Sequence, residues 1–200
     1  MSLLLVTSLT VAMYMRTGAE AHEIRGWRGA ATSTARPAAA PAVANTEGAM
    51  QVNSKIISPG GEFPKRDTCD GGDISPHLAW SDVPASAKSL VLILDDPNAP
   101  GGVFTHWLLW DIPAAVRELA ENAPKTAQLP AGGSQGRNDF GKLGYGGPCP
   151  PPGKPHRYFF RLYALDTVLG LKAGAGRGEL ERAMRGHAVA RGELMGRYGR

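Results

Sequence analysis

The fold of this 200-residue chain is constrained most by three strongly apolar segments: 89–94 (SLVLIL), 105–112 (THWLLWDI) and 157–165 (RYFFRLYAL). They are rich in β-branched, aromatic or continuously apolar residues, and Pro, Gly or Asp bounds each of them. These features predict buried β-strands. Two weaker strand candidates are 52–57 and 187–198.

Helical signals are few. One helical pattern follows the Gly-rich run 174–178. It has the spacing i, i+3, i+4 and i+7, with Leu180, Ala183, Met184 and His187 at these positions. Segment 114–121 is a candidate for a second short helix. The chain has 26 Gly and 16 Pro, which disfavour helix interiors. We therefore predict a mainly β fold, an antiparallel sheet or sandwich with one or two short peripheral helices.

The N-terminal region has the features of an export signal. An apolar run over 3–15 is followed by Ala19-Glu20-Ala21, an A-x-A pattern that precedes signal cleavage. We predict a signal peptide over 1–21, a flexible Ala/Pro-rich leader over 22–49 and a domain over 50–200. The run is shorter than the ~20 residues of a bilayer-spanning helix, so no stable membrane anchor is expected.

Export would place the protein in the periplasm or outside the cell. No Lys or Arg precedes the apolar run, which departs from a typical signal peptide. A misassigned start codon, a disordered tail and a cytoplasmic protein are the alternatives.

The chain contains two cysteines, Cys69 and Cys149, each in a Gly/Pro-rich segment. An even number of cysteines in an exported chain favours one disulfide, and two free thiols are the alternative. The formal net charge is +4, and the basic residues are dispersed along the chain. No basic stripe interleaved with aromatic residues is evident, so no nucleic-acid partner is predicted.

Polar residues cluster at the ends of the predicted strands, where binding residues are commonly presented. Asp96 follows the first strand in a Pro-stiffened turn, and His106 begins the second. His156 and Tyr158 lie two apart on the third, hence on one face, after a loop rich in Gly and Pro. A plain turn, a core histidine and a structural crossover loop are the alternative interpretations of the three clusters.

At these motifs the sequence resembles the phosphatidylethanolamine-binding protein family, in its bacterial Raf-kinase-inhibitor-like branch. The resemblance extends over 51–199, and the motifs that carry it are CDGGDISPHLAW (69–80), DDPNAP (95–100), THW (105–107), NDFG (138–141), the segment 144–166 (GYGGPCPPPGKPHRYFFRLYALD), and the closing GH (186–187) and GRYG (196–199).

The resemblance implies an antiparallel β fold with a small anion pocket at one end. Carried over residue by residue, the pocket consists of Asp96, His106, Gly147, His156 and Tyr158. It also implies a protein without a cofactor that binds a phosphate-bearing or other anionic ligand, such as a phospholipid head group, and that is not an enzyme. A role as a kinase or protease inhibitor is suggested by the family's name alone.

This sequence departs from the family pattern at two places. Asn98 stands where a second aspartate is expected in the turn, and Pro152 and Pro155 lengthen the loop before His156. These departures affect the charge of the pocket and the path of the loop.

The chemistry of the implied pocket suits a phosphate, whose oxygens are strong hydrogen-bond acceptors. Two histidines, a tyrosine and a loop amide supply donors. Asp96 is expected to orient one histidine or to accept a proton from the ligand. Affinity should then rise as pH falls through the histidine pKa. Two alternatives remain for the same pocket. One is a metal triad of Asp96, His106 and His156, and the other is a hydrolase with Cys149 and His156.

Overall fold

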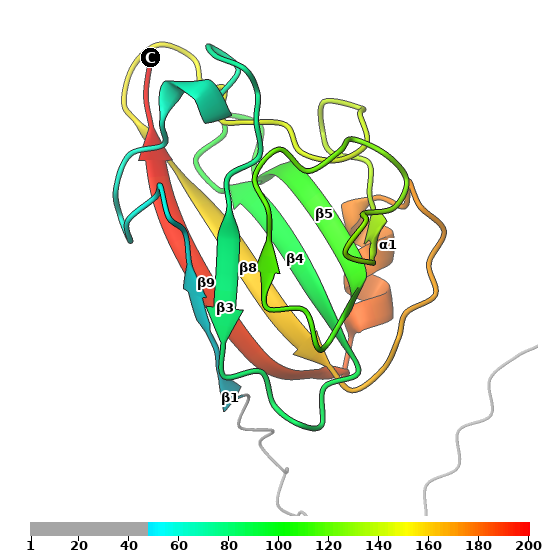
Figure 1. The fold of residues 1–200 in the computed structure, drawn as a ribbon. Coiled ribbons are helices and arrows are strands. Elements are labelled where there is room, and N and C mark those ends of the chain that lie inside the picture. Colours follow the sequence, from blue (N-terminus) through cyan, green and yellow to red (C-terminus); the bar gives the residue numbers. More distant parts are fainter. Residues whose placement is uncertain (1–47) are drawn as a thin grey trace, which may run out of the picture. The chain divides into compact units, whose positions relative to one another are not determined.

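The computed structural model describes residues 48–200 (Figure 1). In chain order its elements are β1 (Gly48–Ala49), β2 (Gln51–Asn53), the 3-10 helix η1 (Lys65–Asp67), β3 (Leu78–Ser81), β4 (Ser89–Asp96), β5 (Phe104–Pro113), β6 (Glu118–Leu119), β7 (Ser134–Gln135), β8 (His156–Leu165), α1 (Arg177–Met184) and β9 (Ala188–Tyr198). The prediction of a mainly β fold is confirmed.

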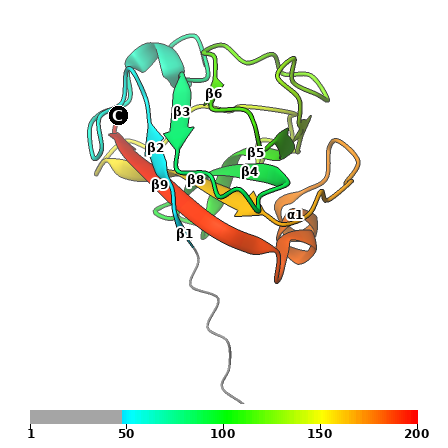
Figure 2. The ribbon, with the colours of Figure 1, turned by 60° about the horizontal axis from the view of Figure 1, so that its bottom comes forward.

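The strands form two sheets. The larger has the order β1-β9-β8-β4-β5-β7, and every neighbouring pair in it is antiparallel except β1 with β9. The smaller is antiparallel, with the order β2-β3-β6. It covers one face of the larger sheet, and α1 lies against the opposite face near β5 (Figures 1 and 2).

Both faces of the central strand β4 are therefore buried, which explains its uninterrupted apolar sequence. On one face, Leu92 and Leu94 pack with Trp80 and Leu78 of the small sheet in the main core. On the other face, Val91 and Ile93 lie in a second cluster, which includes Leu180 and Met184 of α1.

The three strong strand predictions correspond to β4, β5 and β8, and the weaker candidate 187–198 corresponds to β9. The candidate 52–57 is wrong beyond its first two residues, because β2 ends at Asn53. Segment 114–121 is not helical. It turns after β5 and enters β6, where Leu119 is buried opposite Leu78.

Two further boundaries differ from the predictions. His187 does not belong to the helix, because α1 ends at Met184 and Gly186 adopts a left-handed φ of 82°. Gly48 and Ala49, assigned to the flexible leader, pair with β9. The predicted signal peptide and the rest of that leader lie outside the described residues. Within residues 48–200, no helix is long and apolar enough to cross a membrane.

Candidate functional site

The candidate site lies at one end of the large sheet, where β4 ends and its two neighbours, β5 and β8, begin. Because β4 is antiparallel to both β5 and β8, its last residue lies beside the first residues of these two strands. Asp96 ends β4, and His156 begins β8. Strand pairing thus brings together polar residues that are 60 positions apart in the sequence.

A shift in the register between β4 and β5 presents His106 at this end of the sheet. Leu94 is opposite Trp107 and Asp95 is opposite Thr105, so His106 is the extra residue of a β-bulge. Its ring is 2% exposed, and Nδ1 lies 2.8 Å from the carbonyl oxygen of Gly146. A carbonyl can only accept, so Nδ1 carries the proton and Nε2 is the ring nitrogen left for other partners.

Asp96 fixes the second histidine. Nδ1 of His156 lies 2.6 Å from Oδ2 of Asp96, and the backbone N–H of Asn98 donates to Oδ1 at 2.8 Å. Both carboxylate oxygens are thereby engaged, and Nε2 of His156 is left for other partners. The side-chain oxygen of Asn98 accepts from the backbone N–H of Arg157 at 3.0 Å, so the departure at this position ties the turn to β8.

The two histidines line a cavity of about 200 Å³. Its remaining walls are a carboxylate, aromatic rings, prolines and small residues: Asp96, Ala99, Pro100, Phe104, Phe140, Cys149, Pro150 and Pro151. No Lys or Arg is among the residues lining this cavity. Fixed positive charge is therefore missing from its lining, where the two histidines are the groups that can become cationic.

Aromatic rings surround His106 and form part of the cavity wall. The ring centroids of Phe104 and Phe140 lie 5.1 and 5.4 Å from that of His106. Sequence reasoning missed both phenylalanines as site residues, although Phe140 lies in the NDFG motif and Phe104 directly precedes THW. Burial lowers the pKa of His106, an effect partly opposed by the hydrogen bond to Gly146 and by the charge of Asp96.

Tyr158 lies behind the histidines. Its ring centroid is 5.2 Å from that of His106 and 6.5 Å from that of His156. The side chain is fully buried, and its hydroxyl makes no hydrogen bond of normal geometry within the described chain, although the Cys149 backbone and the Asp96 carboxylate lie near it. Burial, reinforced by the charge of Asp96, raises the pKa of Tyr158, so the hydroxyl keeps its proton.

The backbone of Gly147 lies next to His106, but its amide is already engaged. Its N–H donates to Oδ1 of Asp73 at 2.5 Å. The adjacent Gly146 makes the contact with the site, through its carbonyl oxygen and His106.

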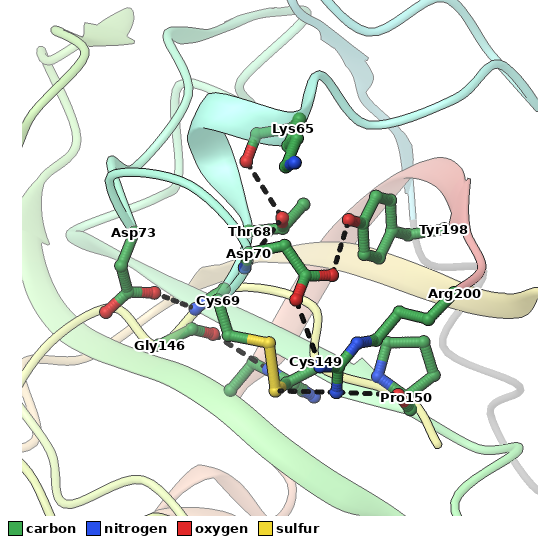
Figure 3. The surroundings of a disulfide bond; sticks show 12 residues. Lys65, Thr68, Cys69, Asp70, Asp73, Gly146, Cys149, Pro150, Tyr198 and Arg200 are labelled. Atoms are coloured by element: carbon green, nitrogen blue, oxygen red, sulfur yellow. Dashed lines mark hydrogen bonds and ion pairs between the residues drawn. A yellow bond between two sulfur atoms is a disulfide. The ribbon is translucent and has the colours of Figure 1, made fainter. Parts of the chain in front are cut away.

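Cys69 and Cys149 form a disulfide, with an S–S distance of 2.06 Å (Figure 3). The bond ties the loop after η1 to the loop before β8, and Cys149 is part of the cavity wall. While this bond is intact, the sulfur of Cys149 cannot act as the nucleophile of the alternative Cys149/His156 hydrolase. Between residues 48 and 200, no group of three His, Cys, Asp or Glu side chains is placed to hold a metal ion.

The family described as phosphatidylethanolamine-binding protein matches residues 53–199, nearly all of the described structure. The chain belongs to the phosphatidylethanolamine-binding protein family. A UPF0098 protein of Aquifex aeolicus is 52% identical to it over 153 residues, covering 76% of this chain and 89% of that protein. A UPF0098 protein of Methanothermobacter thermautotrophicus is also 52% identical, covering 76% and 99% of the two chains.

Two solved structures of the family share the fold. A putative phosphatidylethanolamine-binding protein homologue from Chlamydia trachomatis has a TM-score of 0.70 and 43% identity, covering 77% of this chain and 99% of its own. YbcL of E. coli, named as a new member of the mammalian family, has a TM-score of 0.71 and 35% identity, covering 76% and 98%. The family predicted from the sequence motifs is thus confirmed.

Proposed function

We propose that this protein binds a small phosphate-bearing or other anionic ligand in the His106/His156 cavity, and that it is a binding protein rather than an enzyme. One observation carries the proposal. Two histidines, each fixed through Nδ1, line the same small cavity, and the hydroxyl of Tyr158 beside them makes no hydrogen bond of normal geometry within the described residues. A ligand with acceptor oxygens would satisfy these groups.

The tautomers fixed by the structure make binding depend on protons. In a neutral histidine whose Nδ1–H is donated elsewhere, Nε2 is an acceptor, and it donates only after the ring is protonated. A protonated His156 would be neutralised by Asp96, and a protonated His106 would give the cavity a net positive charge. Phosphate binding should therefore be accompanied by proton uptake at the histidines.

The family name supports a phospholipid head group as one source of the anion, and a soluble phosphate ester has the same chemistry. Isothermal titration calorimetry with inorganic phosphate, phosphoethanolamine and divalent metal ions would test the assignment. Binding of the phosphates without metal, lost in a His106→Ala/His156→Ala double variant, is expected. Undiminished binding in that variant, or binding only after a transition metal is added, would overturn it.

We further propose that the protein is exported. The apolar run and Ala19-Glu20-Ala21 support a cleaved signal, and a disulfide is compatible with an oxidising compartment. N-terminal sequencing of the protein made in its native host should find a mature chain starting at or near His22. An intact Met1 in the cytosolic fraction would contradict export.

A further inference from the structure

A second cavity, of about 190 Å³, adjoins the proposed anion site. Its lining includes Gly146, Gly147 and the ring of Phe140, with Asp73 and Lys142 as charged members. An apolar cavity of about 150 Å³ is large enough to hold one benzene molecule. The second cavity is therefore large enough for a single aromatic ring.

The two cavities share their dividing wall. Phe140 lines both of them. The disulfide spans the same boundary, because Cys69 lines the second cavity and Cys149 lines the first. Gly146 also belongs to this wall: it lines the second cavity, and its carbonyl oxygen accepts from His106 of the first. A ligand anchored at the histidines would thus have the second cavity as its immediate neighbour.

The Phe140 ring is held from several sides and remains 41% exposed. Its centroid lies 4.7 Å from that of Phe104. It also rests on Gly146, where a Cβ would lie only 2.6 Å from ring atom Cδ2. The backbone N–H of Phe140 donates to Oδ1 of Asn138, which is buried. The backbone of Phe140 is therefore held in place, and its ring offers an apolar surface to both cavities.

One wall of the second cavity suits an aromatic group. The space that a side chain would take at Gly146 is filled by the Phe140 ring, so the ring is packed against the backbone on one side. Its exposed part favours edge-to-face or offset contact with another ring. Asp73 adds no free charge, because its carboxylate binds Lys125 and the Gly147 amide.

We propose that the two cavities form one ligand site, whose ligand is a phosphate monoester with a planar apolar substituent. The phosphate binds at His106 and His156, and the substituent lies along Phe140 in the second cavity. This inference rests on the proposed function, because it requires phosphate at the histidines.

Calorimetric titrations with inorganic phosphate and with phenyl phosphate would test this assignment. The wild-type protein should bind phenyl phosphate about 3- to 10-fold more tightly, the range expected for one added aromatic contact. Phe140→Leu keeps an apolar side chain but removes the ring. It should bring the ratio of the affinities for phenyl phosphate and inorganic phosphate close to one. Val103→Ala is the matched control, because Val103 is exposed and lines neither cavity; its ratio should equal that of the wild type.

Amide chemical shifts locate the substituent independently of affinity. Phenyl phosphate should shift the amide of Lys142, which lines only the second cavity, and inorganic phosphate should leave it in place. Equal affinities for the two ligands, or a preference for phenyl phosphate that survives Phe140→Leu, would overturn the second subsite while leaving the anion site intact. Failure of both ligands to bind would instead overturn the proposed function and this inference with it.

Discussion

Nδ1 of His156 donates to Oδ2 of Asp96 across 2.6 Å, between side chains that are 11% and 4% exposed. The same two residue types also meet on the surface, where Nδ1 of His187 lies 2.9 Å from Oδ1 of Asp166 and both side chains are about half exposed. The two pairs share their chemistry and differ in burial. The surface pair is therefore a matched control for the buried one.

We predict that Asp96→Asn destabilises the protein by about 1.5–3 kcal/mol, the range for a hydrogen bond to a charged group in a buried site. The two donors, His156 and the N–H of Asn98, address different oxygens of Asp96, and in the amide one of these positions is an NH2 group that cannot accept. Asp166→Asn should cost less than about 1 kcal/mol, because exposed ion pairs contribute little. Urea unfolding at pH 7 measures both, and equal losses would show that burial adds nothing to the Asp96 pair.

Removal of either pocket histidine should weaken anion binding. His106→Ala and His156→Ala are each expected to lower the affinity for phosphoethanolamine by about 10- to 150-fold, the equivalent of about 1.5–3 kcal/mol per charge-assisted hydrogen bond. His187→Ala should leave it unchanged. Wild-type affinity should fall between pH 6 and pH 8, because a neutral Nε2 cannot donate to phosphate, and both pocket variants should flatten this dependence. A wild-type affinity that is the same at both pH values would contradict the mechanism.

The ligand-free protein should respond to pH in the opposite direction. Burial lowers the folded-state pKa of His106 below its usual value of 6.5, so the unfolded chain binds the proton more readily. The stability contributed by a neutral His106 is therefore complete above about pH 6.5 and is lost as pH falls toward the folded-state pKa. His106→Asn should make the decline in unfolding free energy between pH 7 and pH 5 shallower. An unchanged slope would assign that decline to other groups.

The long strands could be predicted because each is a continuous apolar segment that must be buried. Short strands such as β6 could not, because their two-residue pairings depend on tertiary neighbours. Segment 114–121 illustrates this: it contains good helix formers, but burial of Leu119 against Leu78 outweighs their local preference. His187 fits a helical period in the sequence, yet the left-handed Gly186 ends the turn before it.

The candidate site could be predicted in part. The strand-end positions of Asp96 and His156 are evident from the sequence once the strands are assigned, and the structure joins their side chains. The bulge at His106 depends on the register of β5 against β4, which no local pattern reveals. Likewise, the partner of the Gly147 amide is Asp73, 74 positions away. Sequence reasoning therefore could not show that this amide is already engaged.

Tyr158→Phe should change stability and binding in opposite directions. The hydroxyl is buried without a hydrogen bond of normal geometry in the described structure, so its removal should leave the unfolding free energy unchanged or raise it by up to about 1–3 kcal/mol. If the hydroxyl donates to the bound anion, its loss should weaken phosphate binding by about 0.5–1.5 kcal/mol. Thermal unfolding with and without phosphate gives both values. A less stable variant with unchanged affinity would assign the hydroxyl a structural role.

The Cys69–Cys149 disulfide should support both the fold and the site. Freshly purified protein should be about 2 Da lighter than its reduced form, because one disulfide removes two hydrogens. Closing a loop with a sequence separation of 80 stabilises by about 4–5 kcal/mol in the chain-entropy model, so a Cys69→Ser/Cys149→Ser variant should lose stability of that order.

Phosphate affinity should also fall when the disulfide is reduced, under conditions where the protein stays folded. Cys149 and Pro150 line the cavity, and the carbonyl that holds His106 belongs to Gly146 in the same loop. Reduction frees this loop from the segment around Cys69, which is exposed to a reductant. The serine variant is the control, because a reductant should not change its affinity further. If reduced wild type, with folding verified by circular dichroism, binds phosphate as tightly as the oxidised protein, the loop is held in place by its other contacts and the disulfide contributes to stability alone.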